Sequence, residues 1–147
     1  MEKLINQLKR HEGFRSTPYR CTAGKWSIGY GLNLEDNGIS VGGIVLNESI
    51  AELILRSQVR EIIDWLYHLD YTYEIYPSDD QRLYACANMV FNLGRNGFLK
   101  FKKMLRAIEV GDYETASKEM LNSRWAKQVG SRATELAEQM RTGEWQF

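Results

Sequence analysis

The sequence contains few of the residues that hold disulfides and metal ions. It has two cysteines, Cys21 and Cys86, and two histidines, His11 and His68. Two cysteines so far apart match neither a disulfide framework nor the spacing of a zinc site, so we expect both to be reduced thiols. Two scattered histidines do not build a metal site by themselves. We therefore expect no metal and no other cofactor.

Long apolar segments are also missing. There is no run of eighteen or more apolar residues, and residues 1–13 are charged rather than a basic stretch followed by an apolar one. We therefore expect no membrane span and no export signal. The 147 residues, of which 44% are hydrophobic, are enough for one domain with a sizeable core, and this domain can have two lobes.

The net charge is zero, but the charges are unevenly distributed. Residues 1–33 hold six Lys and Arg against two acidic residues, residues 34–94 three against ten, and residues 95–147 ten against seven. If the two basic ends fold near each other, they form a surface suited to an anionic polymer such as nucleic acid or bacterial cell wall. A solvated mixture of charges is the alternative. No basic helix with interleaved aromatics is present, so we expect no nucleic-acid partner.

The spacing of apolar residues predicts an α+β chain that is mostly helical. A short helix over 2–12 leads into a hairpin whose strands, 19–21 and 25–31, flank a turn at 22–24. A polar loop over 33–43 precedes a long helix over 47–69, for which Asn47 is a candidate N-cap. Further helices are predicted from Asp79 or Asp80 to Leu93 and over 98–110, 112–122 and 131–141, with turns at 94–97 and 122–130.

Three polar residues near the N-terminus have a spacing that could carry chemistry. Glu12 ends the first helix, where the helix dipole and an apolar neighbourhood both favour the protonated carboxyl that an acid catalyst needs. The register of the hairpin puts Cys21 and Ser27 on one face, which Gly29 and Gly31 would leave open to a substrate. Taken alone, such residues are more often a surface glutamate, a small buried thiol and a turn serine.

The order of these residues resembles the signature of phage-type lysozymes, the family of the T-even phage lysozyme. That signature is Glu, eight residues, Asp or Cys, five residues, Thr, and here it is carried by segments 11–15, 19–21 and 26–31. The resemblance continues in Asn-Met-Val-Phe-Asn-Leu-Gly at 88–94, Ser-Arg-Trp at 123–125 and Arg-Thr-Gly-Glu-Trp at 141–145. It covers nearly the whole chain apart from a variable middle region.

The resemblance implies a lysozyme-like fold. The expected domain has a small N-terminal β-hairpin lobe over about 13–46 and a connecting helix over about 47–69. A helical C-terminal lobe over about 70–147 includes the N-terminal helix 2–12, and a cleft lies between the lobes.

The resemblance also implies an activity and its residues. Members hydrolyse the β-1,4 bond between N-acetylmuramic acid and N-acetylglucosamine in bacterial peptidoglycan, generally with inversion, and so act as endolysins that lyse the host. Carried over, Glu12 protonates the leaving oxygen, Cys21 activates a water on the opposite face, and Ser27 orients that water. Asn33 and Phe91 occupy positions of substrate contacts. Phe91 matches the family's aromatic residue, whereas Asn33 replaces a leucine.

Departures from the family pattern leave alternatives open. Cys21 stands where the best-known member has Asp, so it is either a weaker base or a thiolate stabilised by Arg20 or Lys25. Ser27 replaces a threonine and Leu32 a histidine. A lytic transglycosylase, which needs only the acid, is a second reading. A non-catalytic peptidoglycan-binding domain on a lysozyme fold is a third.

The resemblance further implies how the protein meets its substrate. We expect a monomer that is made in the host cytoplasm and acts on peptidoglycan in the periplasm. Access to the wall would depend on a holin that opens the inner membrane.

Overall fold

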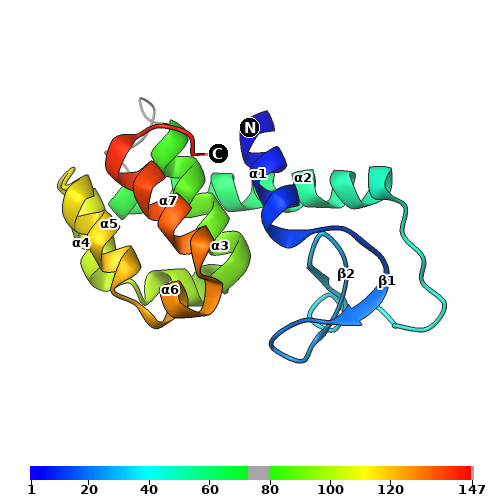
Figure 1. Ribbon diagram of the computed structural model, residues 1–147. Coiled ribbons are helices and arrows are strands. Elements are labelled where there is room, and N and C mark those ends of the chain that lie inside the picture. Colours follow the sequence, from blue (N-terminus) through cyan, green and yellow to red (C-terminus); the bar gives the residue numbers. More distant parts are fainter. Residues whose placement is uncertain (73–79, 147) are drawn as a thin grey trace. The chain divides into compact units, whose positions relative to one another are not determined.

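The α+β, mostly helical class predicted from the sequence is confirmed. A computed structural model describes residues 1–72 and 80–146. In chain order its elements are α1 (Glu2–Glu12), β1 (Arg15–Arg20), β2 (Trp26–Gly29), β3 (Leu32–Asn33), α2 (Glu48–Tyr67), the 3-10 helix η1 (Asp70–Thr72), α3 (Asp80–Leu99), α4 (Lys102–Glu109), α5 (Tyr113–Leu121), α6 (Arg124–Val129) and α7 (Ser131–Thr142) (Figure 1).

The chain divides into two compact units, Met1–Arg60 and Glu61–Phe147, and the division falls within α2. The first unit holds α1, the sheet and the first part of α2. The second holds the rest of α2 and the elements that follow. The lobe limits and the cleft expected from the sequence stay predictions.

Helix α1 forms because its apolar residues recur at helical spacing. Leu4, Ile5 and Leu8 are fully buried and make one apolar stripe of the helix. The helix ends at Glu12 because Gly13 takes a φ of 68°, which favours glycine, and its N–H donates to the carbonyl of Lys9 at 2.9 Å. The chain passes from this end directly into β1.

The predicted hairpin is confirmed, and its sheet has one strand more than expected. β1, β2 and β3 pair antiparallel in that order, and β1 begins at Arg15, earlier than the sequence suggested. The expectation of a loop from Asn33 onward was wrong at its first residue. Gly29 and Gly31 both have positive φ and turn the chain back, so Leu32 and Asn33 pair with β2.

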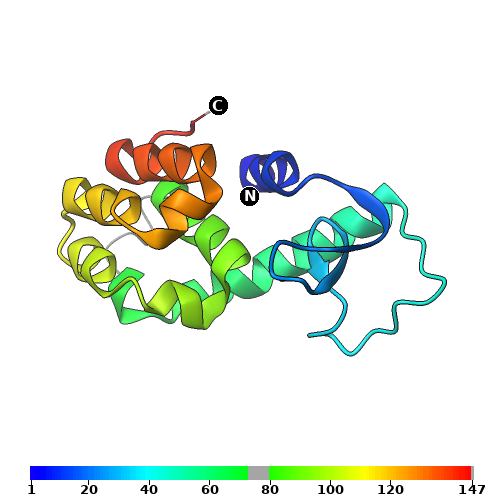
Figure 2. The same ribbon diagram turned by 60° about the horizontal axis from the view of Figure 1, so that its bottom comes forward.

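The position of Gly29 itself is not open to a substrate, contrary to the sequence-based expectation. A Cβ at Gly29 would lie 3.2 Å from the Cβ of Ala51 on α2 and 3.0 Å from the side chain of Leu46. Glycine is therefore needed where the sheet meets α2. The start of α2 is as predicted: the Asn47 side chain accepts a hydrogen bond from the N–H of Ile50 at 2.9 Å. A long loop joins β3 to this cap (Figure 2).

In the second unit, helix α7 packs against α5 and α3, and α4 packs against α5 and η1 (Figure 1). The predicted end of a helix at Leu93 corresponds to a break at Gly94, whose φ is 76°, although helical structure then continues to Leu99. Helix α6 lies where the sequence analysis expected only a turn; the hydroxyl of Ser123 caps it by accepting from the N–H of Ala126. The candidate cap Asp79 lies outside the described residues.

None of the described helices combines the length and the apolar character that a membrane crossing requires.

Candidate functional site

Three of the predicted site residues lie together on the small sheet. Tyr19 pairs with Ser27 across β1 and β2, and Ser27 pairs with Asn33 across β2 and β3. Paired residues point to the same face, and so do residues two apart along a strand. Cys21 directly follows the last residue of β1, and its thiol is hydrogen-bonded by the Ser27 side chain, so it lies on the same face. The predicted placement of Cys21 and Ser27 on one face is confirmed.

The thiol of Cys21 lies in a cradle of hydrogen-bond donors. Partial burial raises its pKa, but hydrogen bonds from the backbone N–H groups of Lys25 and Ala23 and from the Ser27 hydroxyl outweigh this, and the pKa falls below that of an ordinary thiol. The Cys21 N–H itself donates to the carbonyl of Lys25 at 2.9 Å, and the N–H of Gly24 donates to the carbonyl of Cys21 at 2.8 Å. The other N–H groups of this turn, those of Ala23 and Lys25, donate to the sulfur, and such hydrogen bonds favour the thiolate form.

The two cations expected to stabilise a thiolate are engaged elsewhere. The Arg20 guanidinium lies 4.5 Å from the ring centroid of Trp26 and donates to the carbonyl of Gly24 at 2.7 Å. The Lys25 ammonium pairs with the Asp36 carboxylate at 2.8 Å. Hydrogen bonds, rather than the cationic side chains named from the sequence, are thus the main cause that lowers the pKa of the Cys21 thiol.

Ser27 is the most deeply buried of the predicted site residues on the sheet. Only 2% of its surface is exposed. Its hydroxyl lies 3.4 Å from the carbonyl oxygen of Lys25, a long contact, and also within hydrogen-bonding reach of the Cys21 thiol. A single hydroxyl proton can serve only one acceptor at a time. Ser27 can therefore shift its donor between the backbone and the thiolate.

Glu12 lies half-buried at the end of α1, three residues before the first strand begins at Arg15. Its charge acts on Tyr19, which lies on the sheet. Burial first, then the charges of Glu12 and Cys21, raise the pKa of the Tyr19 phenol against an opposing effect of Arg15, whose guanidinium lies 5.0 Å from the ring centroid. Tyr19 is therefore influenced by both the candidate acid and the candidate base. The sequence analysis missed it, although its i, i+2 spacing from Cys21 was the available signal.

The two predicted substrate contacts have different settings. The Asn33 side chain accepts a hydrogen bond from the N–H of Asp36 at 2.8 Å. The backbone carbonyl of Asn33 accepts another from the Asn37 side chain at 2.7 Å. Asn33 therefore shapes the turn after β3. Phe91 is half-buried on α3, in the second unit. The substrate roles of both residues stay predictions.

The second unit has a hollow of its own. Its volume is about 600 Å³, and it lies among the ends of α3 and α5, the start of α4, and α6. Two aromatic rings, Phe101 and Trp125, pack edge to face at 6.0 Å in its wall, and the Trp125 indole N–H donates to the Asn92 side chain at 2.7 Å. Its charged lining is mainly basic: Lys100, Lys102, Lys103 and Arg124, with Glu119.

Side chains of the kinds that bind metal ions are spread apart in the part of the chain that the structure describes. Within residues 1–72 and 80–146, no three His, Cys, Asp or Glu side chains gather closely enough to hold an ion. Cys21 and Cys86 form no disulfide.

Comparison with known proteins finds similarity over nearly the whole chain. The family model described as phage lysozyme matches residues 9–142. The chain is 32% identical over 131 residues to an endolysin of Acyrthosiphon pisum secondary endosymbiont phage 1, covering 89% of this chain and 84% of that protein. It is 30% identical to the probable T4-type lysozyme 1 of Dictyostelium discoideum, covering 97% and 96% respectively. An endolysin of Bacillus phage B103 is 31% identical over 86% of this chain and 45% of its own length.

Proposed function

Because the chain belongs to the phage lysozyme family and is a lysozyme-type cell-wall hydrolase, we propose that it cleaves the β-1,4 bond between N-acetylmuramic acid and N-acetylglucosamine in peptidoglycan. Its biological role in this proposal is lysis of a bacterial host. The observation that carries the proposal is the cradle of donors around Cys21, whose hydrogen bonds lower the pKa of a thiol placed to act as the base.

The acid in this reaction is Glu12. Its carboxyl donates a proton to the glycosidic oxygen as the bond to the anomeric carbon breaks, so the departing sugar leaves as a neutral alcohol. Glu12 suits this role because it lies half-buried at the carboxyl end of α1, a short distance along the chain from the sheet.

The base is the Cys21 thiolate. It takes a proton from a water that attacks the anomeric carbon from the opposite face, and the remaining hydroxyl becomes part of the product, so the configuration inverts. A thiol with an ordinary pKa would be mostly protonated at neutral pH. The lowered pKa of Cys21 reduces this disadvantage relative to the aspartate that the family also uses.

Ser27 completes the water site. When its hydroxyl does not donate to Cys21, its oxygen can accept from the attacking water or its proton can be directed at that water. Because Ser27 is 2% exposed, its position is set by the strand. Serine lacks the methyl group that restricts the rotamer of threonine, so this orientation depends on the neighbouring hydrogen bonds.

The test measures lysis of outer-membrane-permeabilised Gram-negative cells by the wild type, Glu12→Gln and Cys21→Ser, with mass spectrometry of the released fragments. We expect reducing-end muramic acid from the wild type, no lysis by Glu12→Gln, and a large loss in Cys21→Ser, because serine is not deprotonated at neutral pH. Release of 1,6-anhydro ends with full activity in Cys21→Ser would instead identify a lytic transglycosylase. Wall binding without any cleavage would identify a binding domain.

The proposal extends to how the enzyme reaches its substrate. It would accumulate in the bacterial cytoplasm and meet the wall once a holin opens the inner membrane; the similarity to phage endolysins supports this order of events. Cells expressing the protein should therefore remain intact until the inner membrane is permeabilised and then lyse rapidly. Spontaneous lysis during expression would contradict it.

A further inference from the structure

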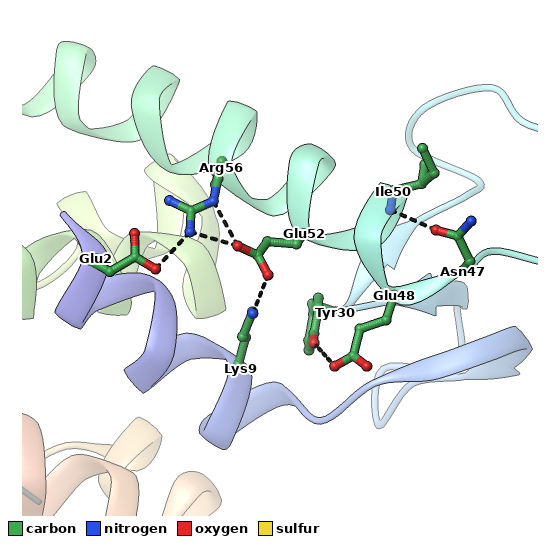
Figure 3. A network of polar contacts seen from close by, with 8 residues as sticks. All are labelled: Glu2, Lys9, Tyr30, Asn47, Glu48, Ile50, Glu52 and Arg56. Atoms are coloured by element: carbon green, nitrogen blue, oxygen red, sulfur yellow. Dashed lines mark hydrogen bonds and ion pairs between the residues drawn. The ribbon is translucent and has the colours of Figure 1, made fainter.

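A network of charged side chains fastens α1 to the first part of α2 (Figure 3). The Arg56 guanidinium on α2 donates to the Glu2 carboxylate on α1 at 2.7 Å and to the Glu52 carboxylate on α2 at 2.6 Å. The second oxygen of Glu52 accepts from the Lys9 ammonium on α1. α1 is thus joined to α2 both near its beginning and near its end.

Lys9 connects this network to the sheet. Its ammonium lies 5.8 Å from the ring centroid of Tyr30, which follows β2. The Tyr30 hydroxyl donates to the Glu48 carboxylate at 2.6 Å, in the first turn of α2. The side chain of Lys9 therefore contacts groups from α2 and from the end of the hairpin, so it fixes α1 against both.

The position of Lys9 along α1 matters for the candidate acid. Lys9 lies three residues before Glu12, so the two are one helical turn apart. Its carbonyl also accepts the N–H of Gly13 that closes the helix at 2.9 Å. A residue fixed at both its side chain and its carbonyl determines where the last turn of α1, and with it Glu12, points.

Within this network the Lys9–Glu52 and Arg56–Glu52 pairs are partly shielded from solvent, whereas Glu2, the other partner of Arg56, is 65% exposed. The side chains of Lys9, Glu52 and Arg56 are 26%, 28% and 22% exposed, so solvent and salt screen them less than ordinary surface pairs. The apolar stripe of α1 sets which face of the helix is buried. Dispersion contacts of that kind give little control over a small rotation or slide along the helix axis, whereas a hydrogen-bonded ion pair is directional.

We propose that Lys9 and Glu52 are positioning residues, which hold the last turn of α1 so that Glu12 is aimed at its substrate. This inference rests on the proposed function, in which Glu12 is the acid. General acid catalysis depends steeply on geometry, and a misplacement of about 1 Å can cost on the order of a hundredfold in rate. Loss of the Lys9–Glu52 contact should therefore lower kcat while KM changes little.

The test compares kcat and KM on solubilised peptidoglycan fragments for Lys9→Met, Glu52→Gln, the double variant and Lys9→Arg, well below the melting temperature of each. We expect each single variant to lose about tenfold in kcat, with KM within about twofold. The double variant should be no slower than either single variant, because all three lack the same contact. Lys9→Arg, which can restore the pair, should recover most of the rate.

Two controls separate positioning from general damage. Arg141→Met removes an ion pair with Glu138 on α7, in the second unit, and should leave kcat unchanged. The rate at which iodoacetamide alkylates Cys21 reports on the sheet side of the site and should be the same in Lys9→Met as in the wild type.

The outcomes distinguish the inference from the function on which it rests. If Glu12→Gln is inactive while Lys9→Met and Glu52→Gln keep wild-type kcat, the inference is overturned and the proposed function stands. Losses in the two single variants that multiply in the double variant would also overturn it, because the residues would then act separately. If Glu12→Gln stays active, the proposed role of Glu12 and the inference fail together.

Discussion

Replacing Gly29 with alanine tests whether close packing of the sheet on α2 supports the first unit. Gly29 has a φ of +65°, and an added Cβ would lie 3.0 Å from the Leu46 side chain and 3.2 Å from the Cβ of Ala51. The Cβ of Ala51 is bonded directly to the backbone of α2, so no side-chain rotation can move it away. Either β2 or α2 must therefore move.

The cost has two parts, which a second variant separates. Positive φ costs an L-residue roughly 1–2 kcal/mol, and overpacking of this kind costs roughly 1–3 kcal/mol. Gly38 has nearly the same φ, +66°, but nothing lies within 4 Å of its would-be Cβ. Gly38→Ala should therefore show the backbone cost alone, and Gly29→Ala should be less stable than Gly38→Ala by roughly 1–3 kcal/mol.

The assay is urea unfolding followed by circular dichroism, with thermal unfolding as a second measurement. For a chain of this size, each kcal/mol corresponds to about 2–4 °C in Tm. Because Ser27 lies two residues before Gly29 on β2, Gly29→Ala should also lower activity, whereas Gly38→Ala should not. Equal destabilisation by the two variants would refute the packing argument and leave only backbone strain.

Three further changes have defined outcomes. Ser27→Ala removes a donor that lowers the pKa of the Cys21 thiol, so the pH midpoint of iodoacetamide alkylation should move upward; an unchanged midpoint would mean that the backbone N–H groups suffice. Hydrogen bonds from Lys9 and Arg56 lower the pKa of Glu52 in the folded protein, so the stabilisation by the ionised carboxylate is complete above its unfolded pKa and is lost as pH falls through its folded pKa. The difference in urea midpoint between wild type and Glu52→Gln should therefore be clear at pH 7 and smaller at pH 3. A difference that stays constant with pH would contradict the ion pairing. Burial, together with the Glu48 carboxylate, raises the pKa of Tyr30 to about 12. Tyr30→Phe should therefore remove one late step from the alkaline absorbance titration and lower the free energy of unfolding in urea by about 0.5–1 kcal/mol. A titration that keeps this step would assign it to another tyrosine.

Local patterns in the sequence determined much of the secondary structure. The apolar stripe of α1, the glycine that ends it and the cap at Asn47 are interactions between residues within a few positions of one another, so the sequence displays them directly. The same holds for the spacing of Glu12, Cys21 and Ser27, because a hairpin with a short turn has few possible registers.

Other features depended on contacts that no local pattern displays. β3 forms because two glycines with positive φ return the chain to β2, and Ala51 packs on Gly29 from a helix that begins after a long loop. Lys9 and Glu52 are 43 positions apart and meet only because α1 and α2 pack together. In the sequence, each is an ordinary charged residue on a helix.

The surroundings of Cys21 show most clearly which features could be predicted from the sequence and which were decided only by the tertiary structure. The sequence identified the thiol in place of an aspartate and pointed to Arg20 and Lys25 as its possible support, because only side chains can be read from a sequence. The structure assigns that support mainly to backbone N–H groups of the turn and to the Ser27 hydroxyl. The direction of a backbone N–H is fixed by the conformation of the turn and the register of the strands, so only the folded chain could decide it.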